Sequence, residues 1–136
     1  MKIRLVSVPI GEKDYDRALE FYTGTLGFMK KSDIPFGEAR LITLVSPEEP
    51  EGPEILLEPG AEYPAMKQLR ESLRKDGIAF TAFQVENVQK EFDRLRKLGV
   101  KFTMKPANTG ISISAIFDDT LGNLIMIYEP TAETAD

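Results

Sequence analysis

The groups that could carry chemistry in this chain of 136 residues are carboxylates, hydroxyls and guanidinium ions, because it contains neither histidine nor cysteine. An imidazole base, a histidine metal ligand and a Ser–His or Cys–His nucleophile are therefore excluded. Glu54 and Glu58 share a strand face with Leu56. Glu58 could act as a general base or hold a cationic ligand at the edge of an apolar site, or it could be a solvated strand end beside Pro59.

Arg40 is a second charged group whose position could matter. Its planar guanidinium suits a carboxylate or a phosphate, so it could pair with an anionic ligand. It could equally pair with Glu38 or Glu54 on the surface of the sheet. The sequence leaves both possibilities open.

Apolar and aromatic side chains in two β-rich runs could line a ligand site. Phe80 and Met126 are expected either in the core or in the apolar lining of a small-molecule site. Tyr128 alternates onto the same strand face as Met126 and could offer a ring and a hydroxyl to a ligand. Glu129 alternates away from Met126 and is expected at the surface.

The composition predicts a single soluble domain with an ordinary core. The chain is 42% hydrophobic and 29% charged. Its net charge of −5 disfavours duplex nucleic acid as a partner, and the basic cluster over residues 67–75 contains Glu71 and indicates a solvated helix face. No apolar run suits a membrane span or a signal peptide, so no membrane partner is expected. Without cysteine, a cytoplasmic protein is expected.

Apolar periodicity and turn residues divide the chain into two halves, each with a strand, a helix and three further strands. In the first half we expect these elements over residues 2–10, 14–27, 28–34, 38–46 and 54–59, with a turn at 35–37. In the second half we expect them over residues 78–85, 87–99, 100–104, 111–119 and 123–130, followed by a frayed tail at 131–136. The prediction is one domain, 1–136, with module one at about 1–60, a connecting helix at about 63–76 and module two at about 77–130.

The two halves can be aligned residue by residue. Adding 73 converts Asp14 to Asn87, which are both candidate N-caps, and Leu19 to Phe92 on the apolar stripes. Each helix can cover one face of its own sheet, so the other face must be buried or used. Two such sheets facing each other would enclose a cleft, which predicts an α+β fold with a ligand cleft between the copies.

Two segments resemble signatures of the vicinal oxygen chelate superfamily, which includes glyoxalase I, extradiol dioxygenases and the bleomycin and fosfomycin resistance proteins. "DYDRALEFYTGTLGF" (14–28) resembles its first helix, and "FDDTLGNLIMIYEP" (117–130) resembles its closing element. The resemblance implies two tandem β-α-β-β-β modules that form a curved, incomplete barrel around a cleft. It also implies a homodimer. The apolar stripe of the connecting helix, Met66, Leu69 and Leu73, could form the dimer interface or could belong to the core.

In enzymes of that superfamily a divalent metal ion sits in the cleft. The resemblance puts its four ligands at Ser7, Phe80, Met126 and Leu56. If the register slips by one residue, Ile55 takes the place of Leu56. A lone serine hydroxyl is a poor ligand, and the other side chains offer no oxygen or nitrogen. The metal-dependent reactions of the family, and a cofactor of any kind, are therefore not expected.

The favoured hypothesis is a metal-free binding protein for a small, largely apolar or aromatic molecule, as in the resistance proteins that sequester drugs. One alternative is a glyoxalase-type lyase, isomerase or dioxygenase that binds metal through unconventional donors such as Glu58. Another is a subunit with a vestigial pocket that acts by association. The candidate ligand-contacting residues are Ser7, Arg40, Leu56, Glu58, Phe80, Met126 and Tyr128.

Overall fold

The computed structural model describes residues 1–131, so most of the tail that was expected to fray, residues 132–136, lies outside the described residues. The chain divides into two compact units, Met1–Gln68 and Leu69–Asp136. Among the described residues, no helix has the length and apolar character that crossing a membrane requires.

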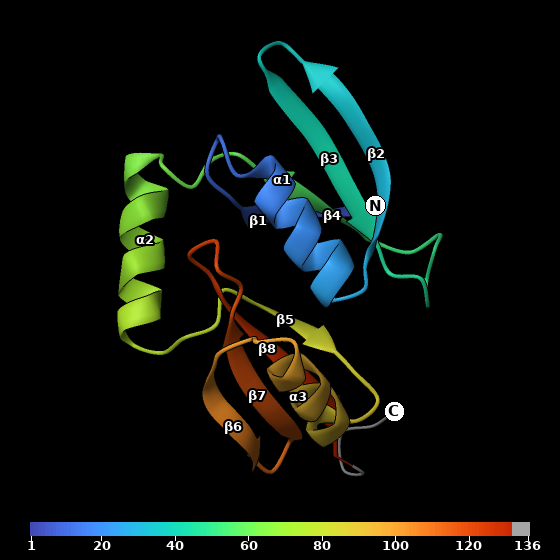
Figure 1. Ribbon diagram of the computed structural model, residues 1–136, viewed down its shortest axis with the longest axis vertical. Helices are drawn as coiled ribbons and strands as arrows, with labels where there is room; N and C mark the ends of the chain where they lie inside the picture. The colour runs from blue at the N-terminus through green and yellow to red at the C-terminus, as the bar shows by residue number, and fades with distance from the viewer. Residues whose placement is uncertain (132–136) are drawn as a thin grey trace. The chain divides into compact units, whose positions relative to one another are not determined.

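The first unit is a four-stranded sheet with a helix across one face (Figure 1). The sheet has the order β1-β4-β3-β2; β1 runs parallel to β4, and the other neighbours are antiparallel. Its elements are β1 (Leu5–Pro9), α1 (Tyr15–Leu19), the π-helical turn η1 (Glu20–Thr25), β2 (Met29–Phe36), β3 (Ala39–Val45) and β4 (Glu54–Glu58).

The second unit repeats this plan with the order β5-β8-β7-β6, in which β5 is parallel to β8. A connecting helix, α2 (Pro64–Lys75), spans the boundary between the units. The elements that follow are β5 (Thr81–Gln84), α3 (Val88–Lys97), β6 (Phe102–Asn108), β7 (Ser112–Asp118) and β8 (Leu124–Pro130). The predicted α+β class with two β-α-β-β-β modules is therefore confirmed.

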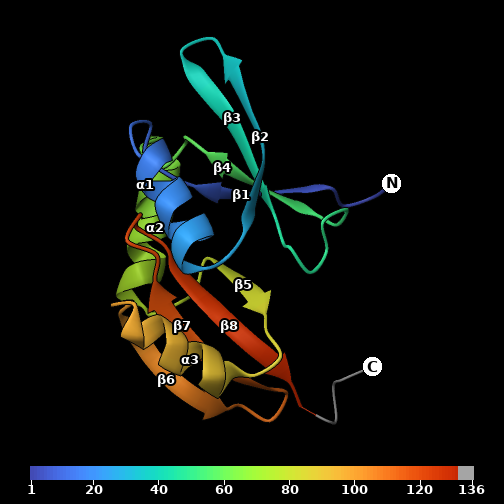
Figure 2. The same ribbon diagram turned by 45° about the vertical axis from the view of Figure 1, so that its right-hand side comes forward.

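Two strands are longer than the sequence predicted, and each runs through a proline. β2 includes Pro35 and Phe36 where a turn was expected, and β6 continues past Met104 through Pro106 to Asn108. Both are edge strands, so a residue without an amide proton costs the sheet little on the outer side. The β2–β3 hairpin thus becomes a long arm, which Figure 2 shows extending away from the rest of its sheet.

The first helix changes its winding in the middle. Leu26 donates its amide to the Phe21 carbonyl at 3.0 Å, a hydrogen bond across five residues that defines a π-turn. The wider turn buries Phe21 as well as Tyr22, although a regular 3.6-residue spacing from Tyr15 and Ala18 would bring Leu26 rather than Phe21 to the buried side. Leu26 is instead only half-buried.

The loop between β7 and β8 is built around a buried carboxylate. Asp119 is fully buried and accepts hydrogen bonds from the amides of Leu121 and Asn123 and from the Asn123 Nδ2, at 2.8–2.9 Å. Gly122 has a φ of +97°, and a Cβ there would collide with the Arg70 guanidinium. Arg70 of α2 donates its Nε to Asn123 Oδ1 at 3.1 Å and its Nη2 to the Leu121 carbonyl. The loop at residues 118–123, part of the closing motif of the sequence, thus binds the Arg70 side chain of the connecting helix.

Replacing Asp119 with alanine should lower the free energy of unfolding by about 2–4 kcal/mol, because buried donors lose their acceptor. Asp118→Ala is the matched control and should cost at most about 1 kcal/mol, since its partners Arg74 and Thr120 are exposed to water. Urea denaturation followed by circular dichroism measures both values. Equal losses for the two variants would contradict the structural role of Asp119.

Candidate functional site

Each sheet has one face covered by its own helix, and we call the opposite side the open face. In the first unit the covered face is identified by Arg40, whose guanidinium carbon lies 5.3 Å from the Tyr15 ring centre of α1. Ile42 and Leu44 alternate with Arg40 and are fully buried. Residues of opposite parity therefore lie on the open face.

A row of four paired residues crosses the open face of the first sheet. Ser7 pairs with Leu56, Leu56 with Thr43, and Thr43 with Ser32. The hydroxyls of Ser32 and Thr43 are 2.7 Å apart and form a hydrogen bond. The centre of this face is thus apolar at Leu56 and hydroxylic on either side, with no charge.

Carboxylates lie on both sides of this row, as the alternation along β4 predicted. Glu54 pairs in register with Leu5 and Val45, and its Oε2 is 3.5 Å from Lys31 Nζ. Glu58 pairs in register with Pro9 and is half-buried. Within residues 1–131 it has no ion-pair partner.

Two neighbouring rows cross the middle of the open face of the second sheet. Its covered face is identified by Glu129, Ile127 and Ile125, because the Glu129 carboxylate accepts the amide of Val88 at the start of α3, at 3.0 Å. Of the open rows, one is apolar and the next is mostly polar. They are Ala82–Met126–Ile116–Met104 and Gln84–Tyr128–Ser114–Ala107. Tyr128 and Met126 therefore share a face, as predicted.

Phe80 lies one row further along β5 than the sequence alignment implied. Ala82, not Phe80, pairs with Met126 as Ser7 pairs with Leu56, and Phe80 donates its amide to the Leu124 carbonyl at 2.8 Å. Equivalent residues of the first strands, Ser7 and Ala82, are therefore 75 positions apart in the chain, whereas equivalent residues of the helices are 73 apart. The reason is that the segment between strand and helix is two residues shorter in the second unit. A shift of two preserves the face, so Phe80 remains on the open side.

A small hollow adjoins Phe80 within the second unit. It leaves about 0 Å³ for a water-sized molecule, whereas a typical small-molecule pocket has roughly 300 Å³ or more. Its walls are Arg70, Leu73, Arg74, Ile78, Phe80, Gly122, Asn123 and Leu124. The hollow lies where α2 meets the β7–β8 loop and is too small to be the ligand site.

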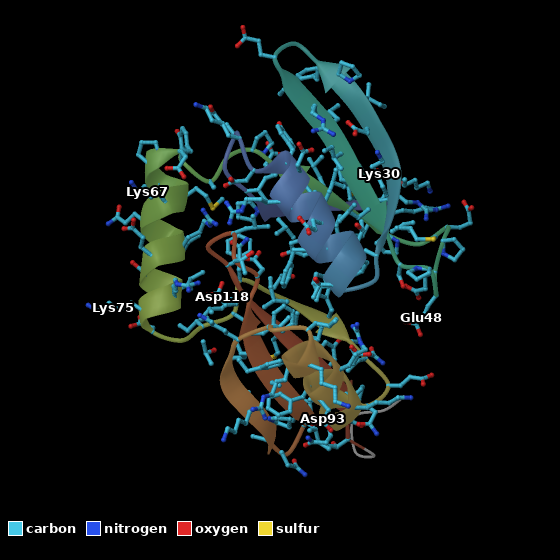
Figure 3. The ribbon with its side chains drawn as sticks, in the orientation of Figure 1. Lys30, Glu48, Lys67, Lys75, Asp93 and Asp118 are labelled. Carbon is cyan, nitrogen blue, oxygen red and sulfur yellow. The ribbon has the colours of Figure 1, made fainter. Side chains whose placement is uncertain are left out.

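The cations beside this hollow are already engaged. Arg74 Nη2 is 2.6 Å from Asp118 Oδ2, and Figure 3 shows Asp118 on the side toward α2. Burial alone would raise the pKa of Asp118, but the hydrogen bonds from Arg74 and the Thr120 amide outweigh it and lower that pKa. Arg70 is held by Asn123 and Leu121. Neither arginine is a preformed anion site.

Two expectations from the sequence require correction. Arg40 lies on the covered face and pairs with Asp33 at 2.6 Å and Asp16 at 3.3 Å, not with Glu38 or Glu54. Its hydrogen bonds lower the pKa of Asp33 and hold the hairpin against α1. Glu129 is half-buried rather than a free surface residue, because its carboxylate satisfies the first amide of α3.

The two predicted N-caps also differ. Asn87 Oδ1 accepts the Lys90 amide at 2.9 Å, as a capping side chain should. Asp14 occupies the N-cap position of α1, but among the described residues its carboxylate accepts from Arg17 Nη1 at 2.9 Å and caps no helix amide.

Sequence reasoning missed four hydroxyls of the open faces, namely those of Ser32, Thr43, Ser112 and Ser114. Ser114 is 1% exposed and its Oγ lies 2.8 Å from that of Ser112. The sequence contained only part of the information needed to find these hydroxyls. Alternation places each of these residues on a face, but cross-strand register is needed to put them beside Leu56 and Tyr128.

The donor set does not fit the divalent metal ion that the family implies. Ser7, Leu56 and Met126 lie on open faces, and Ala82 in place of Phe80 offers no better donor. Across residues 1–131, no group of three or more Asp or Glu side chains is close enough to hold a metal ion. Divalent ions in such sites require several oxygen or nitrogen donors.

Comparison with known proteins gives close relatives over the full length. The chain is 48% identical over 129 residues to the uncharacterized protein YurT of Bacillus subtilis (strain 168), covering 95% of this chain and 99% of that protein. The crystal structure of UcmS2 superimposes with a TM-score of 0.77 at 30% identity, covering 94% of this chain and 97% of UcmS2. TnmS3, an antibiotic binding protein from Streptomyces sp. CB03234, has the same fold, with a TM-score of 0.73 at 23% identity over 96% of this chain and 97% of TnmS3.

Family membership follows from sequence and structure together. The model of the Glyoxalase/Bleomycin resistance protein/Dioxygenase superfamily matches residues 4–127. The matched segment contains both four-stranded units and both helices that cover them. The chain therefore belongs to the Glyoxalase/Bleomycin resistance protein/Dioxygenase superfamily.

Proposed function

We propose that this protein binds a small, largely apolar or aromatic molecule on the open faces of its sheets, without a metal ion and without chemical conversion. The observation that carries the proposal is that the positions implied for metal ligands hold Ser7, Leu56, Met126 and, by strand register, Ala82 in place of the expected Phe80. TnmS3, which is described as an antibiotic binding protein and has the same fold, is a precedent for binding of this kind.

The chemistry of the open faces supports this ligand class. Met104, Ile116 and Met126 form one continuous apolar row, and thioether groups make favourable contacts with aromatic rings. The adjacent row offers the hydroxyl of Tyr128 and the amide of Gln84. Because successive residues on one strand face lie about 6.6–6.8 Å apart, a flat ring system can contact the apolar row and hydrogen-bond to the polar one.

Glutamate substitutions on the open face should abolish binding of an apolar probe. We expect the neutral aromatic dye Nile red to bind saturably to the native protein. Met126→Glu and Phe80→Glu should each weaken binding at least tenfold, because each places a carboxylate against the ring. Leu98→Glu, at a position that is 57% exposed and follows α3, adds the same charge and should change the affinity less than twofold.

Fluorescence titration measures these affinities, and thermal denaturation followed by circular dichroism checks that each variant is folded. Two folded glutamate variants that bind Nile red as the native protein does would refute the assignment of the open face. Phe80 borders the hollow beside α2, so Met126→Glu keeps the test valid if Phe80→Glu fails to fold.

Metal ions should not stabilise the protein. A native-state site occupied at a hundredfold excess over its Kd adds about 2.7 kcal/mol, which raises the Tm of a domain of this size by several degrees. We expect no saturable Tm shift with Ni²⁺, Mn²⁺, Fe²⁺ or Zn²⁺, and no stoichiometric metal in elemental analysis of the purified protein. One tightly bound metal ion per chain would instead favour a glyoxalase-type enzyme with unconventional donors.

We also propose that the protein is a homodimer that associates through α2. No residue of α2 is buried, and Leu69 of its apolar stripe is 47% exposed. Light scattering should give a mass of twice 15.2 kDa, and Leu69→Glu should shift it to that of one chain. Leu98→Glu is the control for added charge. A native protein that stays monomeric at every concentration would disprove this assembly.

A further inference from the structure

Among the described residues that pair in register on the open faces, the charged ones are acidic. Among the described residues of the paired rows, the carboxylates are Glu54 and Glu58 on the first sheet and Asp118 on the second. Lys31, at the bulge of β2, reaches the first face only to pair with Glu54. The open faces therefore disfavour an anionic ligand.

Two of the three carboxylates are neutralised within the chain. Glu54 pairs with Lys31 at 3.5 Å, and Asp118 pairs with Arg74 at 2.6 Å. Glu58 differs, because no cation of residues 1–131 pairs with it although the residue is only partly exposed. Its neighbours in sequence on the open face and in register are Leu56 and Pro9, so the carboxylate borders an apolar surface.

A single carboxylate of this kind suits one class of partner. It provides too few donors for a divalent cation, and no acidic cluster of the described residues adds more. It can, however, pair with one protonated amine, and the low polarity of the surroundings strengthens such a pair. The amine would lie about 6.6–6.8 Å from a group over Leu56, which is the spacing of alternate residues along a strand.

We propose that Glu58 recognises a cationic nitrogen on the ligand, so that this protein selects protonated aliphatic amines with an apolar or aromatic body over neutral and anionic analogues. The inference rests on the proposed function and specifies the ligand for the open face of the first sheet. The aromatic body lies over Leu56 and the hydroxyls of Ser7 and Thr43, and the amine lies beside Glu58 at the edge.

Binding of daunorubicin, a polycyclic aromatic compound with a protonated aliphatic amine on its sugar, and of its neutral N-acetyl derivative tests this inference. Glu58→Gln should weaken binding of daunorubicin roughly fivefold to tenfold and leave that of the N-acetyl derivative unchanged. Glu54→Gln is the matched control on the same strand face, and it should change neither affinity more than twofold because Lys31 already neutralises Glu54. Added salt should weaken daunorubicin binding to the native protein but not to Glu58→Gln.

The outcomes separate the two levels of the proposal. Binding of both probes with no effect of Glu58→Gln, or with equal losses for both probes, overturns the role of Glu58 and leaves the binding function standing. Failure of the folded native protein to bind daunorubicin, its N-acetyl derivative and Nile red overturns the binding function and this inference together.

Discussion

One helix can cover only one face of a four-stranded sheet, and most of this structure follows from that constraint. In each unit the covered face is filled by aliphatic and aromatic side chains, among them Tyr22 in the first unit and Phe117 in the second. The opposite face has no cover from its own helix. The side chains on that face do not have to pack against the helix of their own unit. Strand register decides which residues lie on it.

Register has a simple consequence for chemistry in this chain. It aligns Ser7 with Leu56 and Ala82 with Met126, so the positions that the family resemblance implies for metal ligands carry a hydroxyl and apolar groups. The fold is thus retained without the donors that metal-dependent reactions require. What remains is a surface of thioethers, aliphatic groups and hydroxyls, which suits the recognition of a ring system more than the activation of water.

Charged residues of the chain are used mainly to fix elements in place. Arg40 holds the β2–β3 arm against α1 through Asp33 and Tyr15. Arg70 and Arg74 fasten the C-terminal half of α2 to the β7–β8 loop, where Gly122 leaves room for a guanidinium. Because these cations are committed to structure, the half-buried Glu58 stands out as a carboxylate with no such role in the described part of the chain.

The sequence by itself determined the repeat, the order of the elements and the faces of β4 and β8, because these depend on local periodicity and on spacing along the chain. It did not determine that β2 and β6 continue through Pro35 and Pro106, since only the sheet order shows that they are edge strands. The π-turn that buries Phe21, and the partners of Arg40 and Glu129, also required the tertiary structure. Cross-strand register fixed the row that contains Ser32 and Thr43 and moved Phe80 away from Met126, because pairing joins residues far apart in the chain, which local patterns do not encode.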